Sequence, residues 1–227
     1  MRLLLPIVAI FFISCQSTKD LYPTPDTIIK DQLEWQKDIY FKRIAEFKKQ
    51  PIGYNKIVFL GNSITKGGGD WNEKFNTNNI VNRGISGDYT DGVLMRLDEI
   101  IHYKPIAVFI MIGVNEFWND NSGKPHLTPE YVAGNIINIC KKIKESSSST
   151  KIFIQTILPV NNEQYMNVKK VDYNFLKPDY SPTVNEQINQ TNTILSMIQS
   201  YLNWVFHYHE NNILKERVQK AKKQIQI

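Results

Sequence analysis

The chain has 227 residues, of which 42% are hydrophobic and 22% charged, and its formal net charge is +5. This length suffices for one well-buried domain, and the composition is that of an ordinary soluble globular protein. Lys and Arg are scattered except near the C-terminus, with no basic stripe interleaved with aromatic residues, which argues against nucleic-acid binding.

An apolar run at residues 3–13 follows Arg2. It is too short to span a membrane but typical of the central region of a secretory signal. The run ends in Phe12-Ile13-Ser14-Cys15, which resembles a bacterial lipoprotein cleavage site, although Phe12 stands where Leu is usual. We therefore predict a lipoprotein-type signal peptide over residues 1–15 and a flexible tether over residues 16–25. An ordinary signal peptide or an uncleaved anchor is the alternative.

This interpretation makes the protein exported and anchored to a bacterial membrane through lipid on Cys15, on the periplasmic or surface side, or otherwise secreted. Membrane contact is expected only through that lipid. Cys140, the second cysteine, lies on an apolar helical face and is expected to be a packed core thiol. No metal-ligand spacing occurs, and no metal or organic cofactor is expected.

Strands and helices alternate over residues 26–216. Short apolar runs predict strands at residues 57–60, 79–82, 106–112, 151–158 and 204–208. Helices are predicted over residues 26–50, from Thr90 to about residue 101, from a Thr128 cap to the serines beginning at residue 146, and over residues 182–202, with a long loop at residues 160–181. This alternation indicates an α/β protein, a three-layer α/β/α sandwich around a parallel sheet.

Three short clusters follow the first three predicted strands. They are Gly61-Asn62-Ser63-Ile64-Thr65, Gly84-Ile85-Ser86-Gly87-Asp88 and Gly113-Val114-Asn115-Glu116. Taken singly, such residues usually form turns or helix caps. Because the carboxyl ends of parallel strands share one edge of the sheet, we expect the three clusters to meet there.

Together the clusters supply the parts of an acyl-transfer site. Ser63 offers a hydroxyl nucleophile. The backbone N–H groups of Ser63 and Gly87, with the side-chain amide of Asn115, are suited to bind a developing oxyanion. Gly87 has no side chain to block the approach of a substrate.

At these residues the sequence resembles the SGNH/GDSL hydrolase family, in its acetylhydrolase-like branch, with Gly-Asn-Ser in place of Gly-Asp-Ser. The resemblance extends from about residue 28 to residue 216. It implies that Ser63 is the nucleophile and that Gly87 and Asn115 form the oxyanion hole, with Glu116 in place of the usual Asp. It also implies a flavodoxin-like fold with a five-stranded parallel sheet.

Two other kinds of site could use the same residues. An α/β-hydrolase elbow requires Gly-x-Ser-x-Gly, but position 65 is Thr, which excludes it. A flavodoxin-type phosphate loop would use Ser63, Thr65 and the glycines at 67–69, and would leave Gly87 and Asn115 without a role.

The expected catalytic base and its orienting acid are not found. The family supplies them as Asp-x-x-His after the fifth strand, and this chain contains no such motif. The candidate replacements are His102, His126, His207 and His209, with Asp172 and Asp179 as carboxylates. Residues 217–227 form a divergent basic tail, which suggests a C-terminally incomplete domain, through a frameshift, a truncation or divergence.

The sequence therefore predicts a serine esterase that hydrolyses small acyl esters of carbohydrate or lipid, weak or inactive in this chain. The alternative is a non-catalytic relic of the same fold that binds ligands. An aromatic group in the long loop, with Tyr165 and Tyr173 among its members, suits either a lid or a platform for sugar rings.

Overall fold

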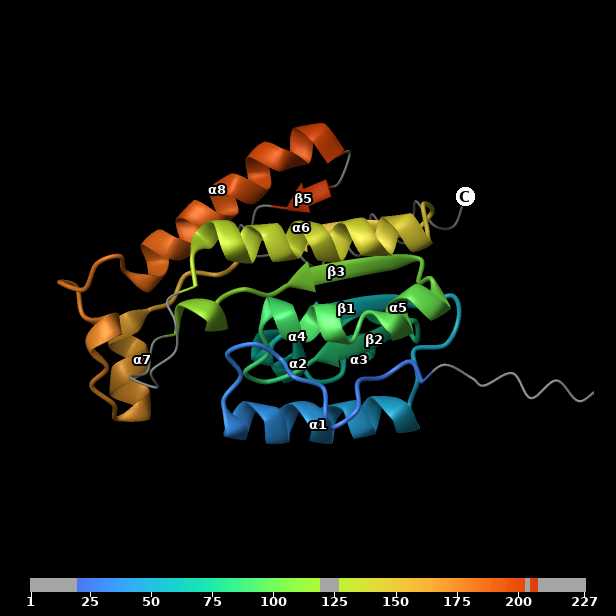
Figure 1. The fold of residues 1–227 in the computed structure, drawn as a ribbon, viewed down its shortest axis with the longest axis horizontal. Helices are drawn as coiled ribbons and strands as arrows, with labels where there is room; N and C mark the ends of the chain where they lie inside the picture. Colours follow the sequence, from blue (N-terminus) through green and yellow to red (C-terminus); the bar gives the residue numbers. More distant parts are fainter. Residues whose placement is uncertain (1–19, 119–126, 203–204, 208–227) are drawn as a thin grey trace, which may run out of the picture.

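The computed structural model describes residues 20–118, 127–202 and 205–207. Its sheet is parallel with strand order β2-β1-β3-β4-β5 and helices on both sides (Figure 1). The strands are β1 (Ile57–Gly61), β2 (Ile80–Gly84), β3 (Ala107–Met111), β4 (Lys151–Gln155) and β5 (Val205–His207).

The predicted α/β sandwich with a parallel sheet is confirmed, and four full-length strands rather than five form its body. Of the predicted fifth strand, the structure describes the three residues of β5, which pair with β4. Gly61 lies opposite Gly84 in β2 and Met111 in β3, so β1, β2 and β3 end level with one another. This register brings the three polar clusters to one edge.

Helices connect and cover the strands. They are α1 (Glu34–Lys49), α2 (Ser63–Gly67), α3 (Trp71–Phe75), α4 (Thr90–Met95), α5 (Asp98–Tyr103), α6 (Pro129–Ser146), α7 (Asn162–Lys169) and α8 (Val184–Leu202), with 3₁₀ turns η1 (Asn115–Phe117) and η2 (Asn174–Leu176). The predicted start of α6 is confirmed, because the Thr128 hydroxyl accepts the N–H of Tyr131 at 3.2 Å.

Two helix predictions were wrong in extent, and one helix lies in a predicted loop. The first helix begins at Glu34 rather than at residue 26, because Asp31 has a left-handed φ of 58° that a right-handed helix cannot include. The helix expected over residues 90–101 is two helices, α4 and α5, because Arg96 leaves helical geometry. The predicted loop at 160–181 contains α7, which begins where Asn161 caps the N–H of Gln164.

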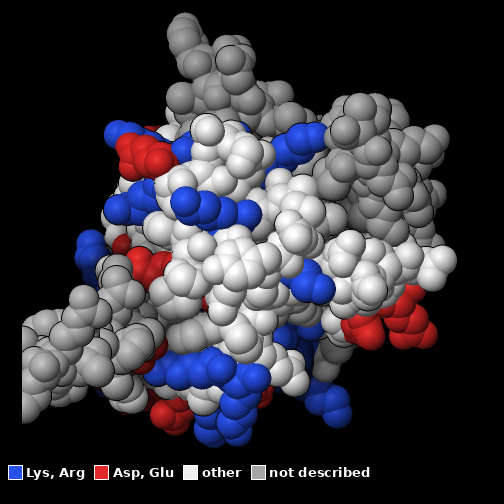
Figure 2. Space-filling model, turned by 90° about the vertical axis from the view of Figure 1, so that its right-hand side faces the viewer, with Lys and Arg blue, Asp and Glu red and all other residues white. Residues whose placement is uncertain are grey.

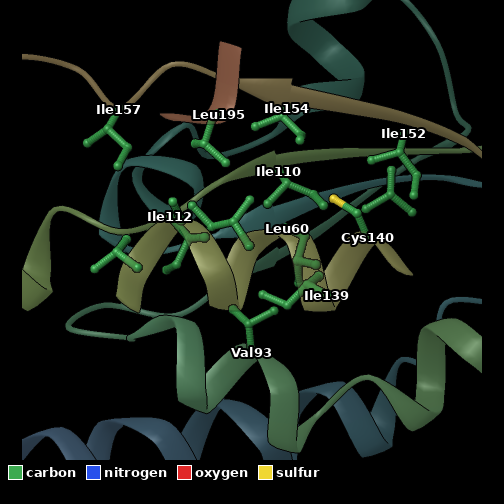
Figure 3. Packing of buried hydrophobic residues seen from close by; sticks show 14 of the residues in the cluster. Leu60, Val93, Ile110, Ile112, Ile139, Cys140, Ile152, Ile154, Ile157 and Leu195 are labelled. Carbon is green, nitrogen blue, oxygen red and sulfur yellow. The ribbon is translucent and has the colours of Figure 1, made fainter. Parts of the chain in front are cut away.

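The period-two alternation of the strands divides the core between the two faces of the sheet. Leu60, Ile110 and Ile154 lie on one face, in the same cluster as Ile139 and Cys140 of α6 (Figure 3). Phe59, Phe109 and Phe153 lie on the other face, with Phe75 of α3. The predicted core thiol is confirmed, since Cys140 is fully buried and burial raises the pKa of its thiol.

The described part of the predicted tether, from residue 20, lies against the domain. Tyr22 donates its hydroxyl hydrogen to Glu99 Oε1 at 2.8 Å, and Asp20 pairs with Lys48 at 2.9 Å. Ordered packing thus begins before the predicted boundary at residue 26. The predicted signal peptide and basic tail lie outside the described residues.

The surface charge is distributed in separate groups. On the face seen in Figure 2, which looks at the amino ends of the strands, Lys and Arg gather in several places among uncharged residues. Among the helices that the structure describes, none combines the length and the hydropathy needed to cross a bilayer.

Candidate active site

A cavity of about 700 Å³ opens at the carboxyl edge of the sheet. The residues lining it are Trp35, Gln36, Ser63, Ile64, Ser86, Gly87, Tyr89, Val114, Asn115, Trp118, Pro159, Val160, Tyr165 and Tyr173. The three residues predicted from the sequence, Ser63, Gly87 and Asn115, are therefore brought together around one cavity.

Ser63 is the exposed first residue of α2, directly after β1. The buried side chain of Asn62 starts this helix by accepting the N–H of Ile64 at 3.0 Å. The first N–H groups of a helix have no partner inside it, so the N–H of Ser63 is oriented at the cavity edge by the helix start. Gly84 allows this placement, because a Cβ there would overlap the backbone nitrogen of Lys66.

Gly87 occupies a turn in which the Asp88 N–H bonds to the Ile85 carbonyl at 3.3 Å. Its φ is +75°, a conformation that glycine adopts without the penalty other residues incur. The Gln36 side chain donates from Nε2 to the Gly87 carbonyl at 3.0 Å. These two bonds hold the Gly87–Asp88 peptide in the turn and against α1.

Asn115 begins η1 after β3 and donates from Nδ2 to the Asp88 carbonyl at 2.9 Å. This bond links the third polar cluster to the second. Because an amide nitrogen carries two hydrogens, one remains to interact with a substrate oxygen. The N–H groups of Ser63 and Gly87 and the Asn115 amide are together the kind of hydrogen-bond donors that stabilise an oxyanion.

A buried ion pair lies directly beneath these turns. Arg96 bonds to Asp88 Oδ2 through Nε at 3.1 Å and Nη2 at 2.8 Å. The same guanidinium donates to the carbonyls of Arg83 at 2.9 Å and Gly61 at 3.3 Å, near the ends of β2 and β1. Burial raises the pKa of Asp88 to about 6, although Arg96 opposes the shift.

Glu116 is a second buried carboxyl group, next to Asn115. Its Oε1 accepts the N–H of Thr90 at 2.6 Å, whereas Oε2 is buried without a hydrogen-bond partner. Burial raises the pKa of Glu116 to about 7, and the nearby Asp88 charge adds to the increase. The carboxyl group ties η1 to the start of α4 and is costly to ionise.

This cost predicts that stability falls as the pH rises from about 4.5, the unfolded pKa, through about 7. The folded pKa is above the unfolded one, so the native state holds the proton more tightly. The loss corresponds to roughly 3 kcal/mol for Glu116. Glu116→Gln, which keeps the Thr90 bond, should be the more stable protein at pH 8 and nearly equal to wild type at pH 5, measured by urea unfolding.

Glu145→Gln is the matched control, because Glu145 is exposed and pairs with Lys141 only at 3.8 Å. Its pH dependence should follow that of wild type. Identical pH dependence of stability in wild type and Glu116→Gln would refute the assignment of this dependence to the raised pKa of Glu116.

The structure does not supply the missing base among the described side chains. His102 lies at the end of α5, before β3, and its ring contacts Tyr103 at a centroid distance of 4.8 Å, far from the cavity. His126 and His209 lie outside the described residues, and for His207 only its place in β5 is described. Asp172 pairs with Lys177 at 3.1 Å, and neither it nor Asp179 lines the cavity. No cluster of His, Cys, Asp and Glu suited to a metal ion occurs in the described part of the chain.

Several lining residues were not predicted from the sequence. Trp35 and Gln36 come from α1, and Trp118 follows η1. The loop after β4 contributes Pro159 and Val160, and α8 holds it there, since the Asn185 side chain bonds both the N–H and the carbonyl of Val160 at 2.8 and 2.9 Å. The sequence signals for these residues were an aromatic residue near the start of α1, Trp35, and an asparagine on α8, Asn185. Neither signal is specific for a cavity-lining role.

A serine, a glycine turn and an asparagine thus meet at the carboxyl edge of a parallel α/β/α sandwich. The chain belongs to the GDSL-like lipase/acylhydrolase family, whose model matches residues 59–214. The predicted family is thereby confirmed.

Curated relatives include human platelet-activating factor acetylhydrolase IB subunit alpha1, 29% identical over 143 residues, which are 60% of this chain and 56% of the relative. The human alpha2 subunit is 32% identical over 108 residues, 45% of this chain and 44% of the relative. The chain thus spans about half the length of the curated relatives it matches.

Solved structures support the fold. Axe2, an acetylxylan esterase from Geobacillus stearothermophilus, has a TM-score of 0.51 at 19% identity over 75% of this chain and 83% of its own. The acetyl xylan esterase AlAXEase has a TM-score of 0.53 at 17% identity over 74% of this chain and 84% of its own.

Proposed function

We propose that the protein hydrolyses small acyl esters of carbohydrate or lipid with Ser63 as its nucleophile. The observation that carries the proposal is the convergence of Ser63, Gly87 and Asn115, from three separate clusters, on one cavity. Family membership supports the reaction class, and the names of the relatives and structural neighbours support acetyl groups as the acyl part.

In the proposed reaction the Ser63 hydroxyl attacks the ester carbonyl. The N–H groups of Ser63 and Gly87 and the Asn115 amide stabilise the oxyanion, each donor contributing about 10²–10³ in rate. The alcohol leaves, and water then hydrolyses the acyl-serine to release the acid. Attack and departure both require proton transfer, for which serine normally depends on histidine.

The 227-residue polypeptide contains no Asp-x-x-His, so we expect it to turn over slowly. Catalysis that depends only on the oxyanion hole and binding remains measurable in serine hydrolases that lack a triad member. Such a site should also respond to a base supplied from solution.

The test measures 4-nitrophenyl acetate hydrolysis by wild type and Ser63→Ala over a series of imidazole concentrations. We expect the wild-type rate to exceed that of Ser63→Ala and the difference to grow with imidazole, because imidazole replaces the absent base. Subtracting the Ser63→Ala rate removes the reaction of imidazole itself. Peptide mass mapping should find one acetyl group on Ser63.

Equal rates in the two proteins at every imidazole concentration, with no acetyl group on Ser63, would contradict the proposal. That result would favour the alternative, a non-catalytic relic that binds ligands in the same cavity.

Export and anchorage through lipid on Cys15 are a further proposal, supported by the Phe12-Ile13-Ser14-Cys15 motif. Labelled palmitate should enter the wild-type protein and not Cys15→Ala when each is expressed in a bacterial host. Equal labelling of both would contradict lipidation at Cys15.

A further inference from the structure

The first turn of α1 forms part of the cavity although it precedes the family-matched residues 59–214. Trp35 and Gln36 are the second and third residues of this helix. In Figure 1, α1 runs below the β2 side of the sheet, and its contacts with Gly87 bring its first turn to the carboxyl edge. The three polar clusters alone do not predict that residues of α1 line the cavity.

Gln36 fixes α1 against the turn that carries Gly87. Its side chain is 3% exposed and uses both ends of the amide. Nε2 donates to the Gly87 carbonyl at 3.0 Å, and Oε1 accepts the N–H of Leu33 at 2.9 Å. A buried amide that is satisfied at both ends has one favourable orientation, so the helix start is held in register with Gly87.

Trp35 occupies the space that Gly87 leaves open. A Cβ on Gly87 would lie 2.9 Å from Cη2 and 3.0 Å from Cζ3 of the indole. The ring is therefore in contact with the glycine proposed to bind the oxyanion. Half of Trp35 remains exposed, so the indole offers free apolar surface at the cavity.

The other residues that line the cavity indicate what kind of molecule it can bind. Among the described residues around the cavity, none is Asp, Glu, Lys, Arg or His. Rings of Trp118 and Tyr165 meet edge to face at a centroid distance of 4.8 Å, and both line the cavity. Aromatic faces combined with amide and hydroxyl groups suit a neutral molecule that has apolar faces and a polar edge. A phosphodiester headgroup would find no cation among these residues.

We propose that Trp35 is a substrate-contact residue, whose indole packs against the ring of a neutral acylated sugar while the ester carbonyl reaches Ser63 and Gly87. This inference rests on the proposed function, since it assigns the alcohol part of the same ester. The absence of a cation among the described lining residues favours this sugar ester over a phospholipid.

The test measures binding, so it does not depend on turnover. In the Ser63→Ala background, titration calorimetry or ligand-observed NMR follows methyl tri-O-acetyl-xyloside. We expect Trp35→Ala to weaken this binding by about 10-fold or more and Trp35→Phe to recover most of it, because a smaller aromatic face remains. Tyr54→Ala is the matched control, since Tyr54 is an exposed aromatic residue that does not line the cavity.

The inference is overturned if Trp35→Ala binds the xyloside as tightly as its parent, or if the parent does not bind it. Tighter binding of a water-soluble short-chain phosphatidylcholine than of the xyloside also overturns it. If Trp35 governs binding while Ser63 shows no acetylation or imidazole-dependent rate, the catalytic proposal fails and the binding assignment stands.

Discussion

Replacing Arg96 with Met should lower the free energy of unfolding by about 3–5 kcal/mol. The substitution leaves the Asp88 carboxylate buried without its cation and removes the donors to the Arg83 and Gly61 carbonyls. Both side chains of the pair are at most 4% exposed, so water cannot replace the lost bonds. Urea unfolding at pH 7.5, where Asp88 is ionised in the wild type, measures the effect.

Lys177→Met is the control for the loss of a cation at the surface. Lys177 and Asp172 are 37% and 76% exposed, so breaking their pair should cost about 0–1 kcal/mol. Adding Asp88→Asn to Arg96→Met should restore part of the stability, because the uncompensated charge is gone. A loss in Arg96→Met no larger than in Lys177→Met would show that the buried pair is not structurally important.

Gly87→Ala should reduce the imidazole-supported hydrolysis of 4-nitrophenyl acetate by about 10²–10³, or to the rate of Ser63→Ala. The added Cβ meets the Trp35 ring at 2.9 Å, and a φ of +75° is strained for alanine. Relief of either conflict turns the 86–87 peptide and moves its N–H away from the oxyanion. Initial rates at saturating substrate report the loss.

Gly134→Ala is the matched control, because Gly134 is an exposed glycine of α6 and a Cβ added there would have no atom within 4 Å. It should keep the rate and raise stability by about 0.5–1 kcal/mol. Adding Trp35→Ala to Gly87→Ala relieves the contact but not the backbone strain, so the rate should stay low. A Gly87→Ala rate within about threefold of wild type would remove Gly87 from the oxyanion hole.

Local sequence patterns were sufficient for much of the sheet and its site. The apolar run before Gly61 and the β3 run are buried strands, and the glycine and polar residues after them lie at one edge. These signals are local because strand burial and turn chemistry depend on neighbouring residues. Ser63, Gly87 and Asn115 could therefore be predicted from the short clusters that contain them.

Local patterns failed where a residue is placed by distant partners. The helix after β2 is interrupted at Arg96, whose guanidinium binds backbone carbonyls of β1 and β2 that only the folded sheet brings together. Propensity does not include such a constraint, so this helix was predicted less well in extent than in position.

The sequence by itself determined the sandwich and the Ser63 cluster, because apolar alternation and strand-ending glycines act over a few residues. Only the tertiary structure decided that α1 joins the cavity, since Gln36 meets Gly87 across 51 positions of sequence. It also placed His102 away from the cavity, because the helix that carries it leads to the amino end of β3. Contacts between distant segments depend on how the sheet and helices pack, and no local pattern encodes them.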